Sequence, residues 1–211
     1  FAYSREDQIL ILHLKHLSLL ENMDGKKEAK TIFDSIALNL SEDEKQMLPV
    51  CYLLRNCNQF YTGKKAKEFF MLALKIAIEK GTPADEGYVH NNYGLELFRT
   101  GHHSDAYAKF FKSYDILKET KYHESAYPLN NLAVCKIFKS EYEQAVEYLM
   151  EAQYVNQSIY AGLAIKVHLM TCYRFMHKDD QCQKYMTQLK DYLENEKIFD
   201  LNIIRKLSIN L

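Results

Sequence analysis

The chain of 211 residues carries 27 basic and 28 acidic side chains, so its formal net charge is −1. This balance excludes the basic excess that marks a nucleic-acid-binding domain, and no run of 18 apolar residues suggests a membrane span. Only 7 glycines and 3 prolines occur. Because these two residues break helices, their scarcity favours long helices joined by short turns.

The five cysteines are widely spaced and include no CxxC pair. They stand at Cys51, Cys57, Cys135, Cys172 and Cys182. Such a pattern is typical of reduced thiols rather than of a disulfide framework or a zinc site. No targeting segment is recognisable, so we expect a cytoplasmic protein. The chain begins without Met and ends inside an apolar pattern, and we therefore expect a fragment of a longer protein.

Apolar residues recur with helical spacing in five segments, and a turn follows each one. The segments span residues 9–20, 47–60, 88–98, 127–138 and 163–175. The first three turns contain Gly25, Gly63 and Gly101, and glycine suits a helix C-cap in the left-handed conformation. Helix starts are also marked: Ser41 is a predicted N-cap followed by the three acidic residues 42–44, and Pro83 follows Thr82 at a first helical position.

After each turn a second helix carries a small, a large and another small or apolar residue at positions i, i+4 and i+7. These positions share one helix face. The first residues of the copies are Ala29, Ala66, Ala106, Ala145 and, in a weaker copy, Cys182, so the spacings are 37, 40, 39 and 37 residues. The pattern predicts an all-α chain of about five helical hairpins at residues 5–40, 43–81, 84–120, 124–157 and 159–195, with a partial helix at 197–211.

Two central copies resemble the tetratricopeptide repeat (TPR). The residues Asn92-Tyr93-Gly94 with Gly101 and Ala106, and Asn131-Leu132-Ala133 with Tyr142 and Ala145, are similar to the TPR consensus. The resemblance implies close approach of paired helices at Gly94, Ala133, Ala106 and Ala145, with Phe110 and Leu149 filling the space between repeats. The period exceeds the consensus 34 residues, which predicts longer hairpins, as in the bacterial Rap, PlcR and NprR peptide sensors or the sensor arrays of STAND-class ATPases.

The resemblance further implies a single right-handed superhelical array whose first helices line a concave groove. Positions carried over from the family predict a ligand-binding set. It comprises Tyr52, Arg55, Tyr88, Asn92, Arg99, Tyr127, Asn131, Phe138, His168 and Arg174. Asn92 and Asn131 recur at one phase, where a carboxamide can pair with a peptide backbone. The same asparagines could instead be structural, and the tyrosines and arginines could form a solvated face.

Other residues have simpler interpretations. The tyrosines of the second helices, Tyr107, Tyr114, Tyr142, Tyr148 and Tyr154, are expected to pack between repeats with their hydroxyls at the surface. No phosphate-binding loop, catalytic triad or metal-ligand spacing is present, so we expect no enzyme activity, no cofactor and no metal.

The predicted function is non-catalytic recognition of a protein or peptide, as the sensor or regulatory part of a larger signalling protein. The predicted partners exclude nucleic acid and membrane. The apolar pattern at Ile198, Leu201, Ile204 and Leu207 could dock a partner or a second copy, because a repeat array needs polar ends. The alternatives are a passive scaffold or oligomerisation domain, and an accessory array of an enzyme whose catalytic domain lies elsewhere.

Overall fold

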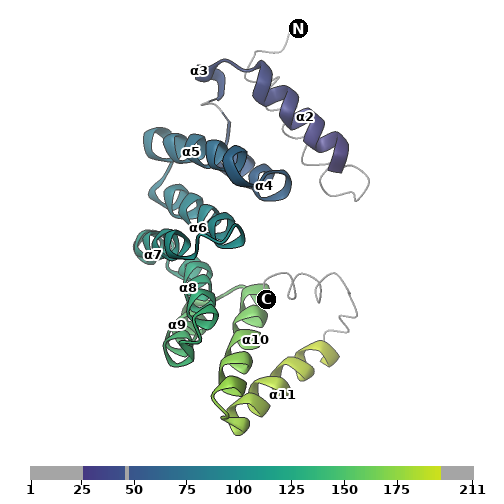
Figure 1. Cartoon of the computed structure of the whole chain (residues 1–211), viewed down its shortest axis with the longest axis vertical. Coiled ribbons are helices and arrows are strands. Elements are labelled where there is room, and N and C mark those ends of the chain that lie inside the picture. Colours follow the sequence, from purple (N-terminus) through teal and green to yellow (C-terminus); the bar gives the residue numbers. More distant parts are fainter. Residues whose placement is uncertain (1–25, 46–47, 196–211) are drawn as a thin grey trace. The chain divides into compact units, whose positions relative to one another are not determined.

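The computed structural model describes residues 26–45 and 48–195, and these residues form helices and turns without a strand (Figure 1). The all-α prediction is therefore confirmed. The predicted helices at 5–20 and 197–211, and the apolar C-terminal end, lie outside the described residues.

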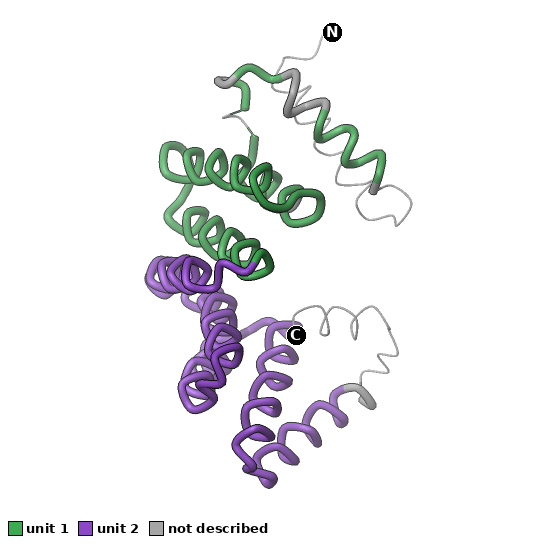
Figure 2. Tube along the Cα trace, viewed as in Figure 1, with its two compact units in different colours: residues 1–100 green, residues 101–211 purple. Residues whose placement is uncertain are grey.

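The helices fall into two compact units, residues 1–100 and residues 101–211 (Figure 2). The first contains α2 Lys26–Asn39, α3 Glu42–Lys45, α4 Val50–Phe60, α5 Gly63–Lys80 and α6 Pro83–Arg99. The second contains α7 His103–Thr120, the 3-10 helix η2 Tyr122–Ser125, α8 Ala126–Phe138, α9 Tyr142–Val155, α10 Ile159–Phe175 and α11 Asp179–Asn195. Helices joined by a short turn pack together as hairpins, namely α4 with α5, α8 with α9 and α10 with α11.

Local sequence explains where several helices begin. The Thr82 hydroxyl accepts a hydrogen bond from Asp85 N–H, the Asp85 carboxylate accepts one from Thr82 N–H, and Pro83 occupies the first turn of α6. This capping box satisfies amide groups that the helix leaves without partners. The expected helix from residue 47 instead begins at Val50, directly after Pro49.

In the described residues four positions adopt the left-handed backbone, and glycine occupies two of them. Gly101 follows α6 as predicted, whereas Gly63 is the first residue of α5 and the C-cap of α4 is Tyr61. Gly63 has φ of 61° and Gly101 of 85°, whereas Ser140 (59°) and His177 (55°) adopt the same conformation with a side chain. After α8, the Ser140 N–H donates to Ile137 O and the Glu141 N–H donates to Lys136 O. These two bonds form a Schellman motif, which ends the helix.

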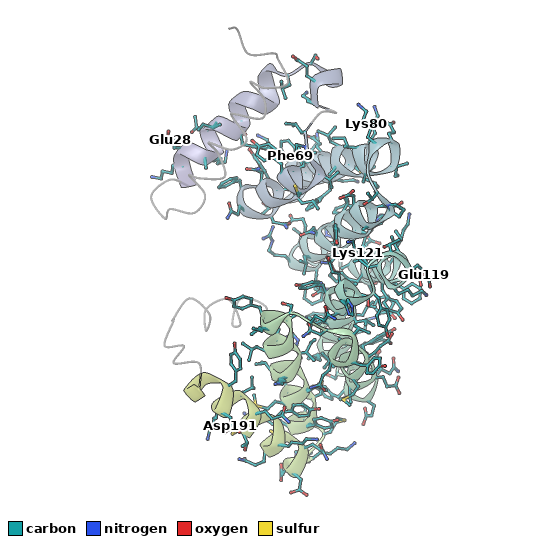
Figure 3. The ribbon with its side chains drawn as sticks, turned by 180° about the vertical axis from the view of Figure 1, so that it is seen from behind. Glu28, Phe69, Lys80, Glu119, Lys121 and Asp191 are labelled. Carbon is teal, nitrogen blue, oxygen red and sulfur yellow. The ribbon has the colours of Figure 1, made fainter. Side chains whose placement is uncertain are left out.

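The first unit has an aromatic core, and Figure 3 labels one of the rings packed against it, Phe69 of α5. The Phe33 ring lies 5.4 Å from the Tyr52 ring and 5.0 Å from the Phe69 ring. Phe70 of α5 stacks on Tyr93 of α6 with centroids 5.1 Å apart. These contacts join α2, α4, α5 and α6 through large rings, of which Phe33, Tyr52 and Phe70 are almost fully buried.

The second unit has a core of small and branched residues. Ala133 of α8 and Ala145 of α9 are fully buried, as is Leu149, and Phe110 is 1% exposed. Burial of these residues is what the repeat motif predicts, because alanine permits close helix approach and the larger residue fills the remaining space. Cys135 and Cys172 are buried small residues of the same kind.

Candidate functional site

The predicted ligand-binding residues differ greatly in exposure. Tyr52 is 1% exposed with its ring against Phe33, and burial raises its pKa above the usual value. His168 is 3% exposed, and its Nδ1 lies 2.8 Å from Asn130 Oδ1. Both are core side chains with no surface to offer a partner, so we leave them out of the site. The Arg55 side chain lies outside the described part of the chain.

Asn92 of α6 is held in place by two hydrogen bonds. Its Nδ2 donates to the Tyr88 carbonyl at 2.8 Å, and its Oδ1 accepts from Asn58 Nδ2 at 2.5 Å. A carboxamide has two N–H donors and two acceptor lone pairs, so each end of Asn92 keeps capacity for one further bond. Tyr88 and Asn92 are half-buried. These two hydrogen bonds give Asn92 a structural role, and its ligand-binding role stays a prediction.

Arg99 takes part in a link between α6 and the turn that joins α4 to α5. Its guanidinium pairs with the Glu96 carboxylate and lies 3.5 Å from the Tyr61 carbonyl. Glu96, which is 4% exposed, also accepts a hydrogen bond from the Gly63 N–H at 2.7 Å. The buried carboxylate therefore caps the start of α5 and holds Arg99, while about half of the Arg99 side chain stays exposed.

Glu96 has no counterpart in the following repeats. The alignment that pairs Asn92 with Asn131 places Cys135 at the position of Glu96. Burying a carboxylate is costly unless it is paired and hydrogen-bonded. A glutamate at a core position of the repeat therefore indicates that its carboxylate has a specific partner. The repeat pattern alone does not indicate this link.

In the second unit, α8 and α10 are the first helices of their hairpins, and each ends at an exposed phenylalanine. Phe138 is 61% exposed and lies 4.1 Å, ring to ring, from His103. Phe175 is 58% exposed and stacks on Tyr142 at 5.1 Å with an interplanar angle of 4°. The pairs are equivalent, since His103 and Tyr142 each stand three residues before a repeat alanine. We call His103, Phe138, Tyr142 and Phe175 the aromatic edge.

The other predicted residues of this unit are accessible. Tyr127 of α8 is 43% exposed and Arg174 of α10 is exposed, whereas Asn131 is half-buried. Arg174 directly precedes Phe175, and Lys139 follows Phe138, so a cationic residue adjoins each exposed ring in sequence. Phe138 was a predicted site residue. His103 was not, because its position in a turn gave no sign of a ring contact.

Four of the five tyrosines on the second helices pack between neighbouring elements, as predicted. The Tyr107 and Tyr148 hydroxyls lie 2.8 Å apart, and Tyr114 donates to Glu151 at 2.6 Å. This hydrogen bond to the carboxylate, together with burial, raises the pKa of Tyr114 to about 12. The prediction fails for Tyr154, which is 81% exposed.

The described residues limit other chemistry. They hold no group of three or more potential metal ligands, and none of their helices could span a membrane. All five cysteines are free thiols. Burial raises the pKa of Cys135 to about 11 and that of Cys57 to about 12, which disfavours the reactive thiolate.

Comparison with solved structures identifies the fold. A candidate kinesin light chain from Podosopora anserina with nearly identical TPR-like repeats has a TM-score of 0.64 at 13% identity, over 93% of this chain and 99% of its own. The fold is that of TPR-like repeats. A second structure of that protein gives a TM-score of 0.63 at 13% identity, covering 94% of this chain and 100% of its own.

A third similar structure is BtubC from P. vanneervenii, with a TM-score of 0.63 at 16% identity over 89% of this chain and 78% of its own. No protein-family model and no curated protein sequence matches the chain. At this level of identity the likeness establishes the α-solenoid fold alone. Function has to be argued from the surface.

Proposed function

We propose that this chain is a non-catalytic module that binds a protein or peptide partner. The observation that carries the proposal is the aromatic edge, where two phenylalanines of equivalent position stand more than half exposed. Isolated exposed apolar residues are normal on a protein surface. Here two of them recur one repeat apart, and each contacts a ring of the preceding second helix.

A partner that covers the two exposed phenylalanine rings gains free energy. Full burial of a phenylalanine side chain is worth roughly 1.5–3 kcal/mol. Rings that are about 60% exposed leave roughly 1–2 kcal/mol each for a partner to gain. Because His103 and Tyr142 already hold these rings in place, less side-chain entropy is lost on binding than at a freely rotating residue.

Polar residues of the two units would add directional hydrogen bonds to the bound partner. Asn92 and Asn131 occur at equivalent positions, and a held carboxamide can accept and donate hydrogen bonds to an extended peptide backbone. Tyr88, Tyr127, Arg99 and Arg174 belong to residue types that dominate interaction hot spots. We include these accessible residues in the proposed binding surface of their respective units.

Binding to the aromatic edge can be tested with the double variant Phe138→Ala/Phe175→Ala. In a pull-down from an extract of the native cell, we expect the wild-type chain to retain partner proteins. The double variant should no longer retain them. The matched control is Tyr154→Ala, which removes an 81% exposed aromatic ring away from the edge. Retention that is equal in all three forms would show that the edge is not a binding surface.

The asparagines require a separate variant, Asn92→Ala/Asn131→Ala. With the edge intact, we expect the retained proteins to bind more weakly, by about 1 kcal/mol for each lost hydrogen bond. Isothermal titration with one identified partner measures the difference. Unchanged affinity would assign both asparagines a purely structural role.

We further propose that the module is the sensor part of a larger signalling protein, as the resemblance to the Rap, PlcR and NprR regulators and to STAND-class arrays implies. The repeat period of 37 to 40 residues supports this, because it matches the long-repeat variety. A gene that joins this array to an NTPase or helix-turn-helix domain would agree with a sensor. A gene that joins it to a catalytic domain would favour an accessory array.

A further inference from the structure

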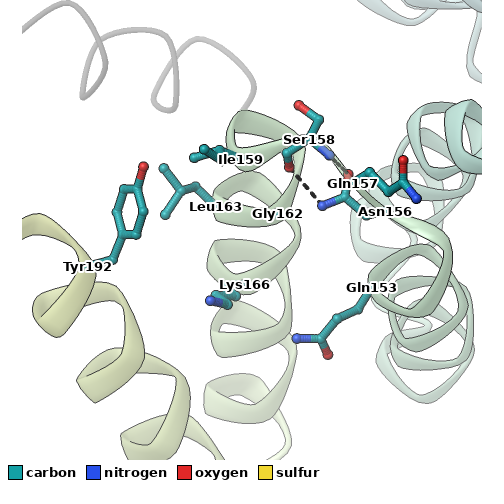
Figure 4. Close-up of a pocket in the computed structure, with 9 residues that line it drawn as sticks. All are labelled: Gln153, Asn156, Gln157, Ser158, Ile159, Gly162, Leu163, Lys166 and Tyr192. Carbon is teal, nitrogen blue, oxygen red and sulfur yellow. Dashed lines mark hydrogen bonds between the residues drawn. The ribbon is translucent and has the colours of Figure 1, made fainter. Parts of the chain in front are cut away.

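A pocket separate from the aromatic edge lies where α9, α10 and α11 meet (Figure 4). Its volume is about 350 Å³, which is at the lower end of the range for small-molecule sites. Figure 4 shows Tyr192 of α11 facing Leu163 of α10, while Gln153 extends from α9. The remaining lining residues are Asn156, Gln157, Ser158, Ile159, Gly162 and Lys166.

The wall between α9 and α10 is preformed. Asn156 Nδ2 donates to the Ser158 carbonyl at 2.7 Å, and the Ser158 N–H donates to Asn156 Oδ1 at 3.0 Å. A Cβ atom at position 162 would stand 3.0 Å from Asn156 Nδ2, so Gly162 makes room for this folded-back side chain. The loop therefore keeps its shape without a ligand, and its asparagine is already engaged.

The charge of the pocket is unbalanced. Lys166 is the one charged residue among the described lining residues, and none of them is acidic. Within the described part of the chain, Lys166 has no carboxylate partner. Ile159 and Leu163 precede this cation by seven and three residues on α10, so they share its helix face, and the Tyr192 ring comes from α11. One cation beside an apolar wall suits a ligand with one negative charge and an apolar tail.

We propose that this pocket binds a small organic carboxylate with an apolar tail. Its carboxylate would pair with Lys166 and accept a hydrogen bond from the Gln153 amide, while the tail would lie against Ile159 and Leu163. A phosphate dianion fits less well, because a single lysine would leave one of its charges uncompensated in a partly desolvated site. The inference does not depend on the proposed partner binding.

The experiment uses the whole chain, labelled with ¹⁵N, and hexanoate as the probe. We expect saturable shifts of the Gly162 and Leu163 amide signals with a Kd on the order of 1 mM, as befits a ligand of few atoms. Methyl hexanoate, which has the tail without the charge, should bind at least fivefold more weakly. Acetate, which has the charge without the tail, should also bind at least fivefold more weakly.

Three variants test the role of the lysine. Lys166→Met should weaken hexanoate binding at least fivefold, whereas Lys166→Arg should retain it. Lys190→Met, which removes an exposed cation of α11 outside the pocket, should leave it unchanged. Equal affinity of hexanoate for the wild-type chain and Lys166→Met overturns the proposal, as does equal affinity of the wild-type chain for hexanoate and its ester. If Lys166→Met does not fold, the arginine variant and the ester still decide.

Discussion

Ser140 and His177 show how a repeat tolerates the loss of its turn glycine. Both adopt positive φ at the end of a first helix, where Gly101 stands after α6. The left-handed conformation costs a residue with a Cβ atom roughly 1–2 kcal/mol. The Schellman hydrogen bonds of Glu141 and Lys178 to the preceding helices hold both residues in this conformation.

From this strain we predict that Ser140→Gly stabilises the chain. Relief of the strain exceeds the extra backbone entropy of glycine in the unfolded chain, so the free energy of unfolding should rise by about 0.5–1 kcal/mol. Urea denaturation followed by circular dichroism measures the change. Ser140→Ala, which keeps the strain, is the control and should bring no gain. A stability decrease in Ser140→Gly would contradict the argument.

Asp34 of α2 is paired with three side chains of the first unit. Its carboxylate accepts hydrogen bonds from Lys30 at 2.6 Å and Lys65 at 3.3 Å, and from the Tyr61 hydroxyl. Burial by itself would raise the pKa of Asp34, but these bonds outweigh it and lower the pKa to about 2. The contact joins α2 to the turn between α4 and α5.

This lowered pKa predicts a pH-dependent contribution to stability. The unfolded chain binds the proton more readily than the folded chain, so the stabilisation is present above about pH 4 and is lost as the pH falls towards about 2. After allowance for solvent screening, Asp34→Asn should lower the free energy of unfolding by about 1 kcal/mol at pH 6. The difference from the wild-type chain should shrink on acidification.

Urea titrations at pH 6, 4 and 3 measure this difference. Asp191→Asn, which changes an exposed carboxylate of α11, serves as the control and should have little effect at any pH. A loss of stability in Asp34→Asn that stayed constant across the three pH values would show that the carboxylate contributes by packing alone.

At the scale of elements, the hairpin of α8 and α9 depends on one face of α9. Ala145, Leu149 and Ala152 lie at the i, i+4 and i+7 positions of the repeat motif and are fully buried. Met150, the neighbour of Leu149, points away from that face and is 46% exposed. The helical period thus separates two adjacent large apolar residues into core and surface.

This separation predicts opposite outcomes for two adjacent truncations. Leu149→Ala should lower the free energy of unfolding by about 2–5 kcal/mol, because it removes buried methyl groups and leaves a cavity. Met150→Ala should change it by no more than about 0.5 kcal/mol, as is usual at the surface. Thermal and urea unfolding give both values. Similar effects of the two substitutions would mean that the face assignment of α9 is wrong.

At the scale of the whole molecule, the chain combines two compact units of one repeat architecture. Their cores are built differently, with packed aromatic rings in residues 1–100 and with alanines and leucines in residues 101–211. The single continuous array inferred from the repeat spacing stays a prediction. The proposed partner surface and the carboxylate pocket in the second unit use different residues, so they can be tested independently.

In the described residues, the sequence by itself determined the helical class, the turns that follow α6, α8 and α10, and the buried alanines of the repeat motif. These features follow from periodicity and capping, which act over a few residues and are therefore readable in a single chain. Even the burial of Leu149 beside the exposed Met150 follows from helix phase.

Only the tertiary structure decided which polar and aromatic side chains are available for binding. Tyr52 and His168 share the groove pattern of exposed residues but are buried, while His103 in a turn meets Phe138 from a helix 35 residues further along. The buried Glu96 and the pocket around Lys166 likewise depend on neighbouring helices. Such contacts depend on how separate helices pack, which the period of one helix does not specify.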